Sequence, residues 1–351
     1  MKTYRLQRFG APLAFEERET PKPRSTEVLL RVTAAGMCHS DLHLCDGGYD
    51  LGRGNKLLAE QRGVALPLTL GHEVSGEIVE TGPDAGEIAR GGNWLVYPWI
   101  GCGICAMCGD GNEHLCNRPR CLGIYRDGGY ADYMLVPHPR YLLDLERLDP
   151  ASASPYACSG LTAYSALRKL GHLIEREPVV IIGAGGLGLM AVRLLKALNG
   201  AGAVVVDVDP CKREAALEAG AISVADGSSL DQACAQVAEW IGGAPHAVID
   251  FVGSENTARL AFECLPKGGK IVCVGLFGGG APWPLPLIAL KAITIQGNYV
   301  GSLSDLKELL ELVRRKHVPP IPITRAPLAS ANEMLERLRN GEVVGRVVLT
   351  P

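Results

Sequence analysis

The chain has 351 residues, more than one hydrophobic core usually supports, so we expect two domains. Hydrophobic residues make up 47% of the sequence and charged residues 21%, which is ordinary for a soluble globular enzyme. A formal net charge of -3 provides no basic surface for nucleic acid or for an anionic membrane. The expected partners are therefore small molecules and other subunits.

No export signal is expected, because the basic residues near the N-terminus are not followed by an apolar run. No stretch stays apolar for the length of a membrane-spanning helix. Twelve cysteines would suggest disulfides in a small secreted chain, but in a large chain without an export signal they favour metal binding in a reducing cytoplasm. We therefore expect a cytoplasmic protein.

The first hundred residues show short β-strand patterns between Gly and Pro turns, with no sustained helical periodicity. The expected strands are Tyr4–Phe9, Glu27–Ala34, Glu73–Glu80 and Trp94–Pro98. This pattern predicts an all-β, barrel-like region. Within it, Asp46–Leu66 contains several glycines and mixed charges, and we expect it to be a surface loop near the substrate entrance.

Residues 38–43 read Cys-His-Ser-Asp-Leu-His and combine a thiol, a hydroxyl, a carboxylate and two imidazoles. A thiolate at Cys38 could bind zinc, but a zinc site needs further ligands from elsewhere in the chain. The candidates are His72, with its neighbour Glu73, and Cys158. We interpret residues 38–43 as the active-site segment.

Four more cysteines follow one another at gaps of two, two and seven residues within residues 101–117. They are Cys102, Cys105, Cys108 and Cys116. Four thiolates at such spacings hold a tetrahedral zinc ion in a closed shell, which leaves no position for substrate, so this zinc would be structural. The alternatives are a redox-active thiol cluster or loop cysteines with no metal. The remaining cysteines have no ligand spacing and receive no function: Cys45, Cys121, Cys211, Cys234, Cys264 and Cys273.

From about Cys158 the sequence alternates between apolar strands and amphipathic helices. The strand Val179–Ile182 leads into a glycine-rich turn and then a helical pattern over Leu189–Leu198. The turn residues are Gly183, Ala184, Gly185, Gly186, Leu187 and Gly188. Glycines allow the tight turn and a close approach of the backbone to a pyrophosphate, and the helix N-terminus supplies N–H donors. We expect a dinucleotide site here.

Asp207 ends the next strand, Ala203–Val206, where an acid would bind the adenosine ribose hydroxyls. Its carboxylate would repel a 2′-phosphate, and the following Val208 brings no positive charge, so NAD is favoured over NADP. The alternative is a solvated turn residue before Asp209.

Four further strands and several helices continue the alternation. The strands are Ala221–Val224, Ala247–Phe251, Lys270–Gly275 and Ala292–Gln296, and the helices are Ser229–Trp240, Asn256–Leu265, Ser304–Arg315 and Ala329–Arg339. Six strands in this order predict a doubly wound parallel sheet. We expect a last strand at Gly345–Leu349 to return to the first domain, so that the nucleotide domain is inserted.

These motifs together resemble the zinc-dependent, medium-chain alcohol dehydrogenases over essentially the whole chain. The resemblance implies an α/β protein with a GroES-like β-rich catalytic domain and an inserted Rossmann domain. The expected division is 1–157 for the catalytic domain, 158–297 for the NAD-binding domain and 298–351 for the return to the catalytic domain. It also implies a zinc-dependent enzyme with NAD as cofactor, an alcohol or carbonyl compound as substrate, and a homotetramer.

The resemblance implies a role for each motif residue. Cys38, His72 and Cys158 resemble the ligands of the catalytic zinc, a set with one open position. Glu73 resembles the acid that approaches the metal, and Asp41 would orient His72. Ser40 and His43 resemble the proton relay, which passes the alcohol proton through the nicotinamide ribose to solvent. The implied cofactor contacts are His39 and Arg346 to pyrophosphate, Asp207 and Lys212 to the adenosine ribose, and Thr162 to nicotinamide.

The chemistry agrees with this ligand set. An alkoxide releases hydride far more readily than an alcohol, and zinc can lower the pKa of bound water from about 15.7 to about 7. His43, with an ordinary pKa near 6.5, could then deliver the proton to water. His43 could equally be a surface imidazole, and Cys158 could be a small buried hydrophobe.

The substrate pocket is less evident in the sequence. Trp99 and Tyr49 would line it, with Leu276 at the nicotinamide end, and such a pocket suits medium-sized primary or secondary alcohols. The alternatives are a polyol or aldehyde-type dehydrogenase of the same superfamily and a non-catalytic NAD-binding sensor. The polyol branch lacks a cysteine at the position of Cys158, which favours an alcohol dehydrogenase.

Overall fold

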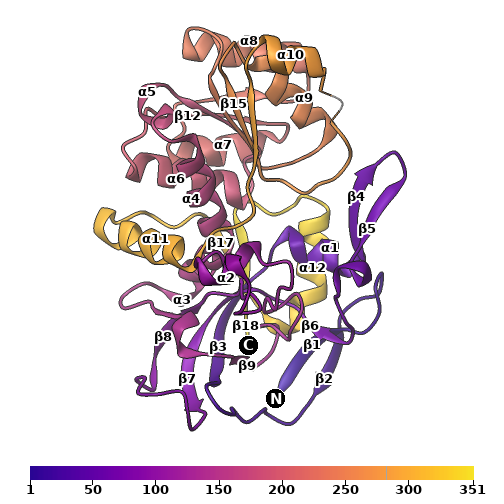
Figure 1. Cartoon of the computed structure of the whole chain (residues 1–351), viewed down its shortest axis with the longest axis vertical. Coiled ribbons are helices and arrows are strands. Elements are labelled where there is room, and N and C mark those ends of the chain that lie inside the picture. The colour runs from indigo at the N-terminus through magenta and orange to yellow at the C-terminus, as the bar shows by residue number, and fades with distance from the viewer. Residues whose placement is uncertain (282) are drawn as a thin grey trace.

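Two sheets of different construction divide the chain, and Figure 1 shows them one above the other along the long axis. The computed structural model describes residues 1–281 and 283–351. The lower half is strand-rich and contains both termini, and the upper half contains a parallel sheet flanked by helices. Across the described residues, no helix combines the length and apolar character needed to cross a membrane.

The lower half is built on a seven-stranded sheet in the order β10-β8-β7-β3-β18-β17, with β9 also paired to β3. Its strands are β3 (Val28–Gly36), β7 (Glu73–Thr81), β8 (Gly91–Val96), β9 (Tyr133–Val136), β10 (Leu142–Asp144), β17 (Ile323–Pro327) and β18 (Arg346–Thr350). A smaller sheet joins β1 (Lys2–Leu6), β2 (Ala14–Glu17) and β6 (Leu68–Thr69). The last strand, β18, pairs antiparallel with β3, which confirms that the chain returns to the first sheet.

The prediction that the first hundred residues contain no helix was wrong. Helix α1 (His39–Cys45) occupies most of the active-site segment. Seven residues make only two turns, too few for a periodic pattern to be visible in the sequence. Its start is nevertheless encoded, because the Asp41 carboxylate accepts a hydrogen bond from the backbone N–H of Cys38 at 2.8 Å.

The expected loop Asp46–Leu66 also contains regular structure. It forms a hairpin of β4 (Gly48–Gly52) and β5 (Asn55–Leu58), followed by the 3₁₀ helix η1 (Glu60–Arg62). The hairpin reaches the other half of the molecule, where the Gly279 N–H donates to the Asp50 carbonyl at 3.2 Å. A Cβ at Gly52 would lie 2.6 Å from the Gly280 nitrogen, so this approach requires glycine. The hairpin therefore bridges the two halves of the molecule (Figure 1).

Short helical segments complete the lower half and connect it to the upper half. They are α2 (Ala106–Gly109), η2 (Glu113–Leu115), η3 (Pro139–Tyr141), α3 (Pro150–Ala153), η4 (Ser154–Ala157), η5 (Leu328–Ser330) and α12 (Ala331–Arg339). Helices α4 (Ser159–Leu170) and α11 (Leu303–Lys316) pack against each other beside the junction, and α5 (Leu173–Arg176) follows α4 in the upper half.

The upper half is a six-stranded parallel sheet in the order β13-β12-β11-β14-β15-β16, which confirms the doubly wound prediction. Its strands are β11 (Val179–Ile182), β12 (Ala203–Asp207), β13 (Ser223–Asp226), β14 (Ala247–Asp250), β15 (Lys270–Cys273) and β16 (Thr294–Gly297). The helices are α6 (Gly186–Ala197), α7 (Pro210–Ala219), α8 (Leu230–Ile241), α9 (Glu255–Cys264) and α10 (Leu285–Leu290). Alternate β11 residues enter two separate cores, Val179 and Ile181 on one face and Val180 and Ile182 on the other. The sheet is thus buried on both faces.

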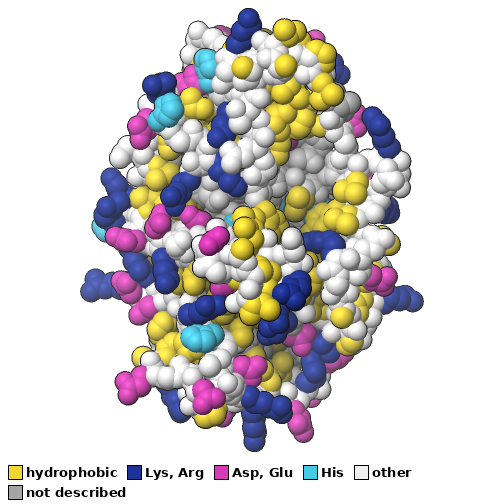
Figure 2. Space-filling view, viewed as in Figure 1, with side chains coloured by type: hydrophobic (Ala, Val, Ile, Leu, Met, Phe, Trp, Pro, Cys, Tyr) yellow, Lys and Arg dark blue, Asp and Glu magenta, His cyan; other side chains and the backbone are white. Residues whose placement is uncertain are grey.

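One end of the upper half is apolar at the surface. Helix α10 exposes Leu285 by 77% and Leu290 by 70%, and the neighbouring strand β16 is the unpaired edge of the parallel sheet. Figure 2 shows hydrophobic side chains gathered at the end of the molecule where Figure 1 places α10. An apolar helix beside an open sheet edge is typical of a surface that another chain covers.

The glycine turn between β11 and α6 gives a specific prediction about folding. A Cβ at Gly188 would lie 1.9 Å from the Gly183 carbonyl oxygen, whereas a Cβ at Gly185 has no neighbour within 4 Å. We expect Gly188→Ala to lower the free energy of unfolding by about 1–3 kcal/mol, because the helix must move away from the strand. Gly185→Ala, the matched control, should unfold at the wild-type temperature yet bind NADH more weakly. Thermal unfolding measures the stability of the two variants, and NADH fluorescence titration measures their affinity for NADH. Equal stability of Gly188→Ala and Gly185→Ala would contradict the prediction.

Candidate active site and metal centres

The three predicted ligands of the catalytic zinc meet in the interior. The ligand atoms of Cys38, His72 and Cys158 all lie within 4.8 Å of one another, and all three side chains are buried. Cys38 lies between β3 and α1, His72 directly before β7, and Cys158 between η4 and α4. Residues far apart in the sequence therefore converge where the seven-stranded sheet approaches the upper half.

The donor set fits a zinc ion. Both ring nitrogens of His72 are buried without a hydrogen-bond partner among the described residues. A hydrogen bond from the Cys158 thiol lowers the pKa of Cys38 well below its ordinary value, and the charges of Arg346 and His72 act in the same direction. Thiolate sulfur and neutral imidazole nitrogen are the ligands that zinc prefers. A metal ion held by the two thiols and one ring nitrogen of His72 would thus explain why that nitrogen is buried without a partner.

Asp41 lies beside the His72 ring, as predicted. One carboxylate oxygen is 3.4 Å from His72 Nδ1, and the other accepts hydrogen bonds from the Cys38 N–H at 2.8 Å and from the Tyr130 hydroxyl at 2.9 Å. Asp41 and Tyr130 are both fully buried. A carboxylate fixed in this way can orient a metal-bound imidazole.

Glu73 and Arg346 form a buried ion pair at 2.8 Å next to the thiols. The same Glu73 oxygen accepts a hydrogen bond from the Ser159 N–H, and its second oxygen has no hydrogen-bond partner in the part of the chain that the structure describes. Burial raises the pKa of Glu73 to about 7 against the opposing charge of Arg346. The Arg346 Nε also has no hydrogen-bond partner among residues 1–281 and 283–351. The pyrophosphate contact predicted for Arg346 stays a prediction.

The predicted relay residues lie on α1 beside the ligands. Ser40 Oγ is 3.7 Å from Cys38 Sγ, and the His43 ring packs on Tyr49 with 4.8 Å between centroids. Burial lowers the pKa of His43, so its ring stays neutral over a wider pH range and can accept a proton. The Arg62 guanidinium covers the Tyr49 ring at 5.1 Å.

An aromatic wall flanks the His72 side of the site. Trp99 meets the His72 ring edge to face at 5.4 Å, and Tyr299 meets Trp99 in the same way at 5.8 Å. Trp99 was predicted to line the pocket and is only 2% exposed. Tyr299 and Arg62 were missed, because no motif marks them in the sequence and only the fold brings them here.

The four-cysteine lobe forms a second metal centre. Cys102, Cys105, Cys108 and Cys116 keep all their sulfurs within 4.8 Å of one another. Two tetrahedral zinc–sulfur bonds of about 2.3 Å place sulfurs about 3.8 Å apart. Cys105 Sγ lies 3.5 Å from Cys108 Sγ and 3.7 Å from Cys116 Sγ, which fits this geometry. Four thiols leave no open position, so this centre can only be structural.

Asp207 and the glycine turn lie at the carboxyl ends of two neighbouring parallel strands, β12 and β11, whereas the other predicted cofactor residues lie on helices or at the start of β18. Asp207 ends β12 and accepts a hydrogen bond from the Ala184 N–H in the glycine turn at 2.7 Å. Lys212 lies in α7 with Nζ 3.9 Å from Asp209, and exposed His39 lies at the start of α1. Thr162 is buried in α4, where its carbonyl accepts from Asn298. Chain order reverses about β11, which is where parallel sheets of this type bind nucleotides.

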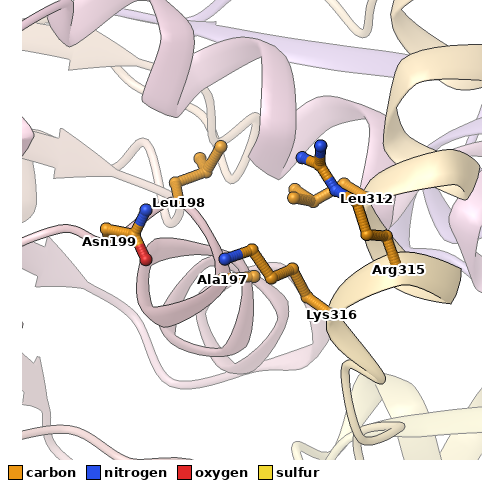
Figure 3. A pocket seen from close by; sticks show the side chains of 6 residues that line it. All are labelled: Ala197, Leu198, Asn199, Leu312, Arg315 and Lys316. Atoms are coloured by element: carbon orange, nitrogen blue, oxygen red, sulfur yellow. The ribbon is translucent and has the colours of Figure 1, made fainter.

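A surface hollow elsewhere does not belong to this site. It lies between the ends of α6 and α11 (Figure 3), and its lining residues are Ala197, Leu198, Asn199, Leu312, Arg315 and Lys316. Helix α6 is about 18 Å long, and the hollow is at its far end from the glycine turn. It contains no residue of either metal centre and no predicted relay residue.

Comparison with known proteins agrees with this geometry. A family model described as "Alcohol dehydrogenase GroES-like domain" matches residues 24–147, and one described as "Zinc-binding dehydrogenase" matches residues 186–315. An "NAD-dependent alcohol dehydrogenase" of Sulfurisphaera tokodaii is 42% identical, with 100% of each chain covered. The chain belongs to the zinc-dependent medium-chain alcohol dehydrogenases. This confirms both the family and the fold predicted from the sequence.

Two further relatives show the range of the family. The crystal structure of the alcohol dehydrogenase from the hyperthermophilic archaeon Aeropyrum pernix is 32% identical, with a TM-score of 0.91 and 100% of each chain covered. A "D-arabinose 1-dehydrogenase (NADP(+))" of Saccharolobus solfataricus is 32% identical, covering 99% of this chain and 96% of the relative. Membership of the family therefore leaves substrate and cofactor to be argued from the residues of this chain.

The position of Asp41 leads to a prediction about metal affinity. Asp41→Asn keeps the size of the side chain but removes the charge that orients His72. We expect the affinity of the catalytic centre for zinc to fall about 10- to 100-fold. Competition with a chromophoric chelator measures this, and Tyr130→Phe, which leaves the carboxylate in place, should cause a smaller loss. Unchanged zinc affinity in the Asp41 variant would show that the carboxylate does not support the ligand.

Proposed function

We propose that the chain catalyses reversible hydride transfer between NAD and a medium-sized primary or secondary alcohol or its carbonyl product, with zinc at Cys38, His72 and Cys158. The observation that carries the proposal is the meeting of these three ligand atoms within 4.8 Å beside a dinucleotide crevice. Glu73 next to them would approach the ion, and the four-cysteine lobe would hold a structural zinc.

The residues around the ligands supply the other parts of the reaction. When bound, zinc acts as a Lewis acid that lowers the pKa of an alcohol hydroxyl, and NAD is the hydride acceptor. Ser40 takes up the alcohol proton as it gives up its own, and His43 accepts the proton that leaves the site and passes it to solvent. Asp41 keeps His72 oriented. Trp99 and Tyr299 exclude water from the His72 side, where charge would otherwise be screened.

The substrate class follows from the wall of the site. Tyr299 and Tyr49 present aromatic surface, buried Trp99 packs behind Tyr299, and the Leu276 side chain is 47% exposed on the upper half. An aromatic wall favours an apolar alcohol over a sugar, whose hydroxyls need hydrogen-bonding partners. A polyol or sugar dehydrogenase is the second candidate, because a D-arabinose enzyme is among the relatives.

NAD is the proposed cofactor because of Asp207. Its carboxylate ends β12 and would face the adenosine ribose, where it repels the 2′-phosphate of NADP. Lys212 would assist at the ribose, and Thr162 would contact nicotinamide. The pyrophosphate would bind at the glycine turn, with His39 and Arg346 as its side-chain partners.

Zinc removal and an alcohol panel test the function together. The protein dialysed against a chelator should lose NAD-dependent alcohol oxidation and regain it when zinc is added, because the catalytic ligands are otherwise intact. Ethanol, benzyl alcohol and cyclohexanol form the panel, with D-arabinose as the comparison. Full activity after removal of both metal ions, or turnover of the sugar alone, would refute the proposal.

We also propose the division of the chain into a catalytic domain at 1–157, an NAD-binding domain at 158–297 and a return to the catalytic domain at 298–351. A cytoplasmic location is proposed because thiols that bind metal persist in a reducing compartment. A homotetramer is proposed from the family, with α10 and the β16 edge as one of its interfaces, since exposed leucines and an open edge there are unsuited to water.

The proposed interface can be tested by solution mass. We expect the wild type to elute as four chains of 37.3 kDa each. Leu285→Glu with Leu290→Glu should produce a smaller species, because two carboxylates would be buried at the contact. Light scattering after gel filtration measures the mass. Leu217→Glu, at another exposed helical leucine, should leave it unchanged, and a tetrameric double variant would exclude this interface.

A further inference from the structure

Two cysteines outside both metal centres lie unusually close together. Cys234 in α8 and Cys264 at the end of α9 have their sulfurs 2.7 Å apart. The sulfur contacts in the four-cysteine lobe are 3.5 and 3.7 Å. Cys234 and Cys264 are thus closer to each other than those metal-ligating thiols, although neither has a ligand spacing in the sequence.

A shared metal ion does not explain this distance. With metal–sulfur bonds of about 2.3 Å, sulfurs 2.7 Å apart would require an angle of about 72° at the ion, far from the tetrahedral angle of about 109°. Among the described residues, neither cysteine belongs to a group of three or more metal ligands. The pair is therefore unsuited to ligation but lies close to the distance of a covalent bond, about 2.05 Å.

We propose that Cys234 and Cys264 form an intrachain disulfide bond when a small-molecule disulfide oxidises them, and that this bond ties α8 to α9. Both cysteines pack against the core on one face of the parallel sheet, and Cys264 is 8% exposed, whereas Cys234 is more accessible. The bond closes a loop that contains β14, whose Asp250 accepts from the N–H groups of Val252 and Gly253 at the cofactor edge. The crosslink would stabilise this part of the sheet.

The oxidation takes place by thiol–disulfide exchange with a small-molecule disulfide such as oxidised glutathione. The Cys234 thiolate attacks one sulfur of the oxidant, which forms a mixed disulfide and releases one glutathione thiolate. The Cys264 thiolate then attacks the Cys234 sulfur, forms the intrachain bond and releases the second glutathione. Two protein thiols are oxidised, one external disulfide is reduced, and the thiol protons pass to solvent or to the released thiolates.

Peptide mapping of the full-length protein tests the bond directly. Trypsin places Cys234 in residues 214–259 and Cys264 in residues 260–267, and neither peptide contains another cysteine. After equilibration with excess oxidised glutathione and alkylation of free thiols, we expect the two peptides to be joined and to separate on reduction. Two separate peptides, with both cysteines alkylated or each carrying glutathione, would overturn the proposal.

Thermal unfolding supplies a second measurement. Closing a loop of this length should raise the unfolding temperature of the oxidised protein by about 5 °C over the reduced protein. In Cys234→Ala, which cannot form the disulfide, the reductant should cause no such shift. This variant therefore distinguishes the effect of reductant on the disulfide bond from its effect on the zinc centres. Cys211→Ser, at an exposed cysteine, is the matched control and should respond like the wild type. An equal reductant effect in wild type and Cys234→Ala would contradict the crosslink.

Discussion

The antiparallel pairing of β3 with β7 is the constraint on which the site depends. Its register places Gly36 opposite Glu73, so that Cys38, two residues after Gly36, and His72, one residue before Glu73, come together. The same end of β3 pairs with β18, which brings Arg346 to Glu73. The carboxyl end of β3 thus brings three distant segments together in one site. A shift of one residue in the register of β3 with β7 would turn the side chains of Cys38 and His72 away from each other.

Burial makes this arrangement electrostatically demanding. A carboxylate, a guanidinium, two thiols and an imidazole lie together in the interior, where an unpaired charge is costly. The Glu73–Arg346 pair and the donors to Asp41 offset part of this cost. The two Cys38 and Cys158 thiols cannot both ionise easily without a cation between them, which is why a divalent ion stabilises the site as well as giving it activity.

The sequence was informative wherever function depends on local spacing. The four-cysteine lobe and the glycine turn each lie within about fifteen residues, so their chemistry was visible before the fold, and the parallel sheet followed from its regular alternation. Helix α1 and the β4–β5 hairpin were not predicted, because each is short and depends on contacts with residues far away. Tyr299 reaches Trp99 only through the packing of the two halves, and no periodicity could indicate that contact.

The β4–β5 hairpin contacts both the upper half and the proposed proton relay. Its Asp50 carbonyl accepts a hydrogen bond from the Gly279 N–H of the upper half, and its Tyr49 ring packs on His43 of the proposed relay. The backbone beside Tyr49, whose ring contacts the proposed proton acceptor His43, is therefore attached to the half that would carry nicotinamide. Because hydride and proton transfer must occur in one closed site, a segment that touches both halves can couple the position of the relay to the position of the cofactor. Glycine at residue 52 permits this close approach, and a larger residue there would separate the two halves along this edge.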